Sequence, residues 1–198
     1  SQLAKIVSSV DLLSGGRTIL GVGAGWHRPE FDGFSEWLPT GKRVAQTSEA
    51  LELITTLWGG GTGDFNGRYF SSKGAEILPS PVQKPHPPMW FGVKGPKMME
   101  LAALYGDGWI PTNITPSDYA SGLQRLREIR TANGIREDIK GALQNFEVFT
   151  DASLCLDTIC EYRDAGCEYY GPIWSYPPEE MISRIHWFAE NVMSSKQL

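Results

Sequence analysis

The stretch Arg17-Thr18-Ile19-Leu20-Gly21-Val22-Gly23-Ala24-Gly25-Trp26 decides the fold. Its apolar residues predict a buried strand, and glycine stands at every second position of its second half. Because alternate residues of a strand share a face, one face carries Leu20, Val22 and Ala24, whereas the other carries glycine. Glycine weakens a strand, and a common reason to keep it is the close approach of a ligand or another backbone. We therefore predict a strand with a side-chain-free surface; a core strand that packs on a helix through small residues is the alternative.

Three motifs resemble the bacterial luciferase-like superfamily, whose members are (β/α)8 barrels that use a flavin or deazaflavin. The first is the quoted stretch with the residues just before it, which is similar to the fourth strand of those barrels. The second is Pro79-Ser80-Pro81-Val82-Gln83-Lys84-Pro85-His86-Pro87-Pro88, and the third is Gly106-Asp107-Gly108-Trp109-Ile110-Pro111. The glycine spacing of the first motif does not match a dinucleotide-binding fingerprint, which has a third glycine at a different offset.

The hydrophobic periodicity predicts one helix followed by five strand–helix units and a hairpin excursion. Helices are expected over 2–14, 42–58, 97–105, 117–133, 153–165 and 178–193, with a short helical turn over 27–34. Strands are expected over 19–22, 89–93, 106–111, 141–149 and 168–174. Such alternation is typical of an α/β fold with a parallel sheet or barrel. We expect one domain, 1–198, with a small hairpin insertion at about 62–80.

The resemblance implies a partial (β/α)8 TIM barrel that lacks the first three strands. A complete barrel has eight strands and typically ~250 residues, whereas this chain has 198. An open piece exposes two sheet edges and an apolar interior. The chain could be a fragment, a shortened natural variant, or a protomer that closes its sheet against a second copy. We expect the last two together, a shortened member whose homodimer completes the open barrel.

Composition and charge narrow the class of protein. The formal net charge of −5 disfavours a broad nucleic-acid-binding face. Neither a membrane-spanning apolar run nor a signal peptide is recognisable, so we expect a cytoplasmic location. The cysteines at 155, 160 and 167 match neither Cys-x-x-Cys nor a zinc spacing, and the three histidines are scattered. We therefore expect no metal site and treat the cysteines as small buried hydrophobic residues.

In barrels of this kind the site lies at the C-terminal ends of the strands. The residues that follow the first three strands are therefore the predicted cofactor-binding set: Gly23, Ala24, Gly25, Trp26, Val93, Lys94, Gly95, Pro96, Lys97 and Trp109. The turn over 94–97 opens a helix, whose free N–H groups and positive end suit a phosphate, and the resemblance implies that the cofactor's phosphate binds there. An ordinary strand-to-helix turn is the alternative. Pro96 lacks an N–H donor, and family members usually carry Gly-Gly and then a small residue here.

A substrate pocket is predicted at the ends of the last two strands, from Asn145, Glu147 and Trp174. We expect Phe146 and Val148 to face the helices, which leaves Asn145 and Glu147 facing inward. A buried carboxylate needs a partner or a ligand. An ion pair with Lys or Arg is the alternative for Glu147, and an ordinary core position is the alternative for Trp174.

No catalytic triad, metal cluster or facing carboxylate pair stands out in the sequence, which fits an enzyme whose chemistry belongs to its cofactor. The segment 23–31, Gly-Ala-Gly-Trp-His-Arg-Pro-Glu-Phe, resembles the branch that uses the deazaflavin coenzyme F420 more than it resembles the FMN monooxygenases. The resemblance thus implies an oxidoreductase that moves a hydride between F420 and a small organic substrate. It gives no catalytic residue, because the family's catalytic acidic and histidine residues often come from early strands, and those strands are absent from this chain. An FMN-dependent monooxygenase and a shortened, non-catalytic relative that binds a flavin or a partner subunit are the alternatives.

Overall fold

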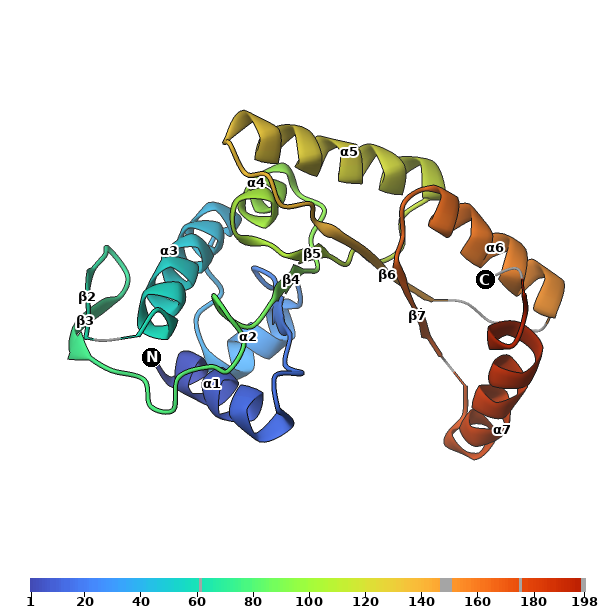
Figure 1. Ribbon diagram of the computed structural model, residues 1–198, viewed down its shortest axis with the longest axis horizontal. Helices are drawn as coiled ribbons and strands as arrows, with labels where there is room; N and C mark the ends of the chain where they lie inside the picture. Colours follow the sequence, from blue (N-terminus) through green and yellow to red (C-terminus); the bar gives the residue numbers. More distant parts are fainter. Residues whose placement is uncertain (61, 147–150, 175, 197–198) are drawn as a thin grey trace. The chain divides into compact units, whose positions relative to one another are not determined.

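The computed structural model describes residues 1–60, 62–146, 151–174 and 176–196 (Figure 1). The helices are α1 (Gln2–Ser14), α2 (Arg28–Phe34), α3 (Thr40–Trp58), α4 (Pro96–Tyr105), α5 (Pro116–Ala132), α6 (Ala152–Asp164), α7 (Pro178–Phe188) and the π-helical turn η1 (Ala189–Met193). The strands are β1 (Leu20–Val22), β2 (Gly63–Asn66), β3 (Ser71–Ala75), β4 (Met89–Phe91), β5 (Gly108–Trp109), β6 (Lys140–Phe146) and β7 (Tyr169–Ile173). The chain divides into two compact units, Ser1–Asp107 and Gly108–Leu198, and each contains parallel strands.

The N-terminal unit is built on the parallel pair of β1 and β4, in which Leu20 lies beside Met89 and Val22 beside Phe91. Met89 and Phe91 are buried, as are the apolar residues of α3 and α4 that face them. The indole Nε1 of Trp58, at the end of α3, donates a 3.0 Å hydrogen bond to the carbonyl of Ala4 in α1. The hairpin β2–β3 is antiparallel and forms a separate two-stranded sheet, as the sequence predicts.

The C-terminal unit carries the parallel strands β5, β6 and β7. Gly108 of β5 lies beside Lys140 of β6, and Ala142 of β6 lies beside Tyr169 of β7. Helix α5 packs on β6, because a Cβ built at Gly141 would meet the Tyr119 hydroxyl at 2.7 Å and Leu123 of α5 at 3.2 Å. Cys155, Phe188 and Val192 form a second small core between α6, α7 and η1.

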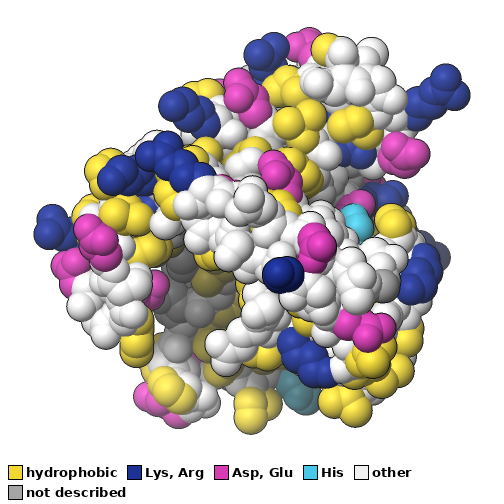
Figure 2. Space-filling view, turned by 90° about the vertical axis from the view of Figure 1, so that its left-hand side faces the viewer, with side chains coloured by type: hydrophobic (Ala, Val, Ile, Leu, Met, Phe, Trp, Pro, Cys, Tyr) yellow, Lys and Arg dark blue, Asp and Glu magenta, His cyan; other side chains and the backbone are white. Residues whose placement is uncertain are grey.

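The order of helices and strands agrees with the prediction, and the fold is α/β with parallel strands. The strand expected over 106–111 is shorter than predicted, and residues 147–149 of the strand expected over 141–149 lie outside the described residues. No helix in the described part of the chain is long and apolar enough to cross a membrane. The described residues contain no group of three or more metal-ligating side chains. On the face in Figure 2, basic and acidic side chains are interspersed among hydrophobic ones.

A buried carboxylate fixes α1 to the proline-rich connector in the N-terminal unit. Asp11 is fully buried. Its Oδ2 accepts hydrogen bonds from the backbone N–H groups of Val82 at 2.8 Å and Gln83 at 3.0 Å, and its Oδ1 accepts one from the Gln83 side-chain amide at 2.7 Å. The same amide also donates to the carbonyl of Thr18 at 2.8 Å, just before β1. One carboxylate therefore positions the entry to β1 and the connector that leads to β4.

This carboxylate predicts a pH-dependent contribution to stability. Burial raises the pKa of Asp11, but the hydrogen bonds from Gln83 and Val82 outweigh burial and hold the pKa below its ordinary value of 3.8. Since the folded-state pKa is lowered, the contribution is present above the unfolded pKa and is lost as the pH falls through the folded pKa. Asp11→Asn should therefore lower the free energy of unfolding at pH 7 by roughly 1.5–3 kcal/mol, the range for hydrogen bonds to a charged group. The difference from the wild type should shrink below about pH 4.

Urea denaturation of both proteins between pH 3 and 7 measures this difference. The control is Asp164→Asn, which removes an exposed ion pair with Arg163 and should change stability by less than ~0.5 kcal/mol. A difference between wild type and Asp11→Asn that stays constant over this pH range would contradict the role of the carboxylate charge.

Candidate functional site

The N-terminal unit presents an open face made mostly of glycine. In the parallel register of β1 and β4, Gly21 lies beside Trp90. Gly23 and Gly92, two positions further along each chain segment, continue the same face. A Cβ built at Gly21 would meet no atom within 4 Å, and one at Gly23 would meet the Gly92 carbonyl oxygen at 4.0 Å and nothing closer. The three glycines are exposed and Trp90 is half-buried. The two strands thus offer a flat surface, here called the glycine face, with the indole of Trp90 beside the glycines.

The opposite face of the same strands is packed, which keeps the glycine face rigid. Met89, Phe91 and Val93 are buried. The backbone N–H of Gly92 donates to the Val22 carbonyl at 3.0 Å and extends the parallel ladder past the ends of both strands. The Asp107 carboxylate accepts from the N–H of Met89 at 2.9 Å, and the Asp107 N–H donates to the Met89 carbonyl at 2.8 Å. These bonds fix β4 at both of its ends.

The turn after β4 leads directly into α4. Gly95 is the N-cap of this helix, Pro96 occupies its first position, and the N–H of Met99 donates to the Gly95 carbonyl at 2.9 Å. The N–H groups of Lys97 and Met98 come before that first helical bond and carry the positive end of the helix dipole. Lys94, Gly95, Pro96 and Lys97 are all exposed, whereas Val93, also predicted to bind the cofactor, has a buried side chain.

The loop after β1 is held by its own side chains. Gly25 adopts a positive φ of 77°, and a Cβ at this position would lie 2.3 Å from the Phe31 ring, so only glycine fits. The buried Arg43 donates from Nε to the Ala24 carbonyl at 3.2 Å and from Nη1 to the Leu38 carbonyl. Gly25 and Ala24 therefore shape the loop, and their surfaces toward Phe31 and Arg43 are occupied.

Trp26 stands at the mouth of β1 and is 86% exposed. Its ring lies 5.1 Å from that of His27, at a tilt of 44°. Helix α2, which follows, buries none of its residues, and Phe34 at its end is also exposed. Trp26 therefore follows the end of β1 with its indole accessible to solvent.

Trp109 occupies a different environment from the one that the sequence suggests. It is 1% exposed, and its ring stacks on Tyr119 of α5 with a centroid distance of 5.1 Å and an interplanar angle of 18°. A Cβ at Gly122 would lie 2.3 Å from the indole, so α5 covers the ring closely. Burial also raises the pKa of the Tyr119 hydroxyl above its ordinary value. The expected cofactor role of the Trp109 ring is therefore corrected to a core role under α5.

The residues predicted for a substrate pocket divide into three cases. Asn145 lies beside Pro172 and shares a face with Gly141 and Leu143, which is the face that α5 covers. The expected inward orientation of Asn145 is therefore wrong, because the alternation along β6 is the reverse of the predicted one. Glu147 lies outside the described residues. Trp174 is half-buried, packs edge-on against Phe188 at 5.6 Å, and lines a cavity within the C-terminal unit.

Two residues of the N-terminal site are missing from the predicted set. The alternation of residues 89–93 could have identified Trp90. It puts Trp90 and Gly92 on one face of the strand and the buried Met89, Phe91 and Val93 on the other. Arg43 gave no such signal, because an arginine near the start of an amphipathic helix is usually solvated. Its burial depends on carbonyls that include one from a loop 19 residues earlier in the chain.

Comparisons with known proteins bear on the family and the fold of the chain. The model of the luciferase-like monooxygenase family matches residues 1–189. An F420-dependent secondary alcohol dehydrogenase in complex with an F420–acetone adduct has a TM-score of 0.76 at 20% identity, and the match covers 86% of this chain and 68% of that one. Monooxygenase RslO1 from Streptomyces bottropensis has a TM-score of 0.74 at 19% identity, with 97% and 73% covered. The F420-dependent tetrahydromethanopterin reductase from Methanopyrus kandleri has a TM-score of 0.72 at 15% identity, with 97% and 78% covered.

Identities this low show the fold alone, an α/β fold consistent with part of a luciferase-like TIM barrel; the matches cover 68–78% of these three structures. The family match is independent of them and covers nearly the whole chain. It also confirms the resemblance that the three sequence motifs indicated. The chain belongs to the luciferase-like monooxygenase family.

Proposed function

We propose that this protein is an oxidoreductase that moves a hydride between the deazaflavin coenzyme F420 and a small organic substrate. The observation that carries the proposal is the glycine face, which lies at the C-terminal ends of β1 and β4 and leads into the start of α4. Cofactor sites of (β/α)8 barrels lie at this end of the strands.

The glycine face fits a flat tricyclic ring by its shape. Side chains at Gly21 and Gly23 would project into open space, so their absence leaves room for a planar group against the backbone. A strand position normally disfavours glycine, because glycine packs no side chain and loses more conformational freedom on folding. Close approach of a ring would explain why two glycines are kept on one face of β1.

The residues around this face have separate roles in the proposal. Trp90 offers an aromatic surface beside the ring. The N–H groups at the start of α4, with the exposed cations of Lys94 and Lys97, would hold the phosphate. When bound, F420 supplies the atom that accepts or donates the hydride. The protein supplies position and electrostatics, and no catalytic acid or base is assigned.

FMN is the second candidate cofactor, because monooxygenases are among the similar structures. They include the EDTA monooxygenase EmoA from Chelativorans sp. BNC1, with a TM-score of 0.64 at 17% identity; the match covers 93% of this chain and 46% of that one. FMN also joins a flat tricyclic ring to a phosphate, so the same face and turn suit both cofactors. The glycine face therefore supports the class of cofactor, and the choice of F420 depends on the segment 23–31.

Titration of the purified protein with F420 and, separately, with FMN tests the proposal. We expect saturable quenching of F420 fluorescence and much weaker binding of FMN. Saturable binding of FMN alone would instead support the monooxygenase. Binding of neither would overturn both and leave a non-catalytic relative. Where F420 binds, reduction of F420 in the presence of short secondary alcohols, followed at its visible absorption band, would show hydride transfer.

A further inference from the structure

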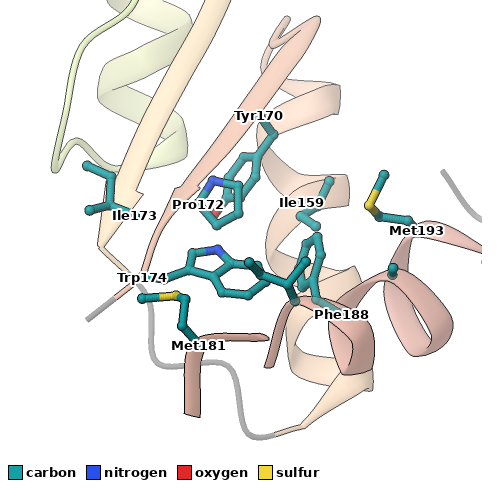
Figure 3. Close-up of a pocket in the computed structure, with 10 residues that line it drawn as sticks. Ile159, Tyr170, Pro172, Ile173, Trp174, Met181, Phe188 and Met193 are labelled. Carbon is teal, nitrogen blue, oxygen red and sulfur yellow. The ribbon is translucent and has the colours of Figure 1, made fainter. Parts of the chain in front are cut away.

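The C-terminal unit contains a cavity of about 710 Å³ between β7, α6, α7 and η1 (Figure 3). Trp174, the residue after β7, projects toward Phe188 of α7, and Ile159 of α6 lies near Phe188. All of these residues belong to the same compact unit, so the cavity does not depend on how the two units are placed. Its volume lies within the ~300–1,000 Å³ typical of pockets for small organic ligands.

The lining determines which ligand the cavity suits. The lining residues that the structure describes carry no charged side chain. A charged group placed among them would lose part of its hydration and meet no oppositely charged side chain of the lining, which is more unfavourable than the burial of an uncharged polar group. Three aromatic side chains, Tyr170, Trp174 and Phe188, present ring surfaces. The chemistry therefore favours an uncharged aromatic molecule.

A cation near this lining already has partners. Arg184 lines a small hollow that shares Trp174 and Phe188 with the cavity. Its guanidinium lies 4.7 Å from the ring centroid of Tyr176, and its Nη2 lies 3.3 Å from Oε2 of Glu180. An anionic ligand would have to compete with Glu180 for this guanidinium. Arg184 thus adds no preference for an anion.

The two methionines of the lining let the cavity adapt to its ligand. Met181 comes from α7 and Met193 from η1, and Met193 is 67% exposed. Unbranched thioether side chains repack easily and make favourable contacts with aromatic rings. We infer that this cavity is a binding site for an uncharged aromatic small molecule. The inference is independent of the proposed cofactor site, since no residue of the glycine face takes part.

Methyl NMR of the full chain labelled with ¹³C-methyl methionine tests this inference. The chain has five methionines, of which Met89, Met98 and Met99 are buried in the N-terminal unit and serve as internal controls. On titration with 2-naphthol, the Met181 and Met193 signals should shift saturably, with a Kd on the order of 1 mM or tighter for a ligand of this size. The control signals should stay in place. The anionic 2-naphthoate should cause shifts only at much higher concentration.

A variant that fills the cavity completes the test. Ala189→Trp places an indole in the lining and should abolish the naphthol-induced shifts. Ser183→Trp adds the same group at an exposed position of α7 that is not part of the lining and should leave them unchanged. Unaltered control methionine signals show that the N-terminal unit of each variant is folded, and far-UV circular dichroism checks the whole chain.

Three results would overturn the inference. Equal shifts of all five methionine signals would indicate non-specific binding. Equal affinity for 2-naphthol and 2-naphthoate would show that the ligand class is wrong. Movement of the Met181 and Met193 signals with protein concentration, without any probe, would show that a second copy of the chain occupies the cavity instead.

Discussion

Replacing Gly23 by valine should weaken cofactor binding by roughly 10- to 100-fold and leave the fold intact. Two branched methyl groups would stand in the space where the ring is proposed to lie, and overfilling a packed site costs about 1–3 kcal/mol, where 1.4 kcal/mol is a factor of ten in Kd. The backbone tolerates the change, because Gly23 has no positive φ and a Cβ built on it would meet the Gly92 oxygen only at 4.0 Å. Valine is also a favourable residue in a strand.

Fluorescence titration of F420 against the Gly23→Val variant measures this effect, and a thermal melt reports the stability of the same sample. Gly23→Ala, with one methyl group, should give a smaller loss and make a graded series. The matched control is Gly41→Val, at an exposed position of α3 where a Cβ meets no atom within 4 Å. Unchanged affinity in Gly23→Val, with normal stability, would mean that the ring binds elsewhere.

The order of elements could be predicted from the sequence because the patterns that specify it are local. Helices α1, α3 and α5 follow from apolar residues at a period of 3.6, and Gly15 ends α1 in the left-handed conformation that its position requires. The hairpin and the helix start at Pro96 are likewise local signals, although Asn66 pairs with Ser71, so residues 67–70 form the turn rather than the predicted Asn66-Gly67. These features depend on neighbours a few residues away.

The faces of the strands were predicted less well, because a face depends on what packs against it. Trp109 belongs to a strand of only two residues, whose alternation cannot be established from its neighbours. Its face is set by Gly122, a helical residue that leaves space for the indole. The sequence predicts an inward Asn145 by placing Phe146 toward the helices, whereas the contacts of Gly141 with Tyr119 and Leu123 of α5 put the odd-numbered residues on that side.

Polar contacts between distant segments were not predictable at all. The carboxylate of Glu49 in α3 accepts hydrogen bonds from the backbone N–H groups of Arg68, Tyr69 and Phe70 at 2.9, 2.6 and 2.6 Å. These bonds lower the pKa of Glu49 although desolvation opposes them. Carbonyl and N–H groups carry no sequence signal, so their side-chain partners emerge only in the folded chain.

Arg43 is the buried polar group with the most direct consequence for the proposed site. Besides the Ala24 and Leu38 carbonyls, its Nη2 lies 3.4 Å from the Thr40 hydroxyl. Its Cζ lies 3.8 Å from the ring centroid of Trp37, so the planar guanidinium covers the indole. One side chain therefore joins the loop that follows the glycine face to the start of α3. An arginine is suited to this task because its five N–H donors lie in one plane.

Arg43→Met should lower the free energy of unfolding by roughly 2–4 kcal/mol. Methionine keeps much of the apolar stem but leaves two loop carbonyls without their donor, and an unsatisfied buried group costs about 1–3 kcal/mol. Arg43→Lys should recover only part of this loss, because an ammonium cannot bridge the three acceptors and cover the indole at once. The control is Arg28→Met, whose exposed pair with Asp32 should contribute less than ~1 kcal/mol.

The Arg43→Met variant should also bind the cofactor less tightly, even at temperatures where it is folded, because the loop after β1 is no longer anchored. The carbonyl of Ala24 adjoins Gly23, so a loss of the Arg43 bond loosens one border of the glycine face. We expect the F420 Kd of Arg43→Met to rise several-fold in the cold, where both proteins are folded, with Arg28→Met unchanged. A variant that melts below the wild type yet binds F420 equally well would restrict Arg43 to a structural role. Equal melting temperatures of Arg43→Met and the wild type would show that water satisfies the two carbonyls and that the loop needs no anchor.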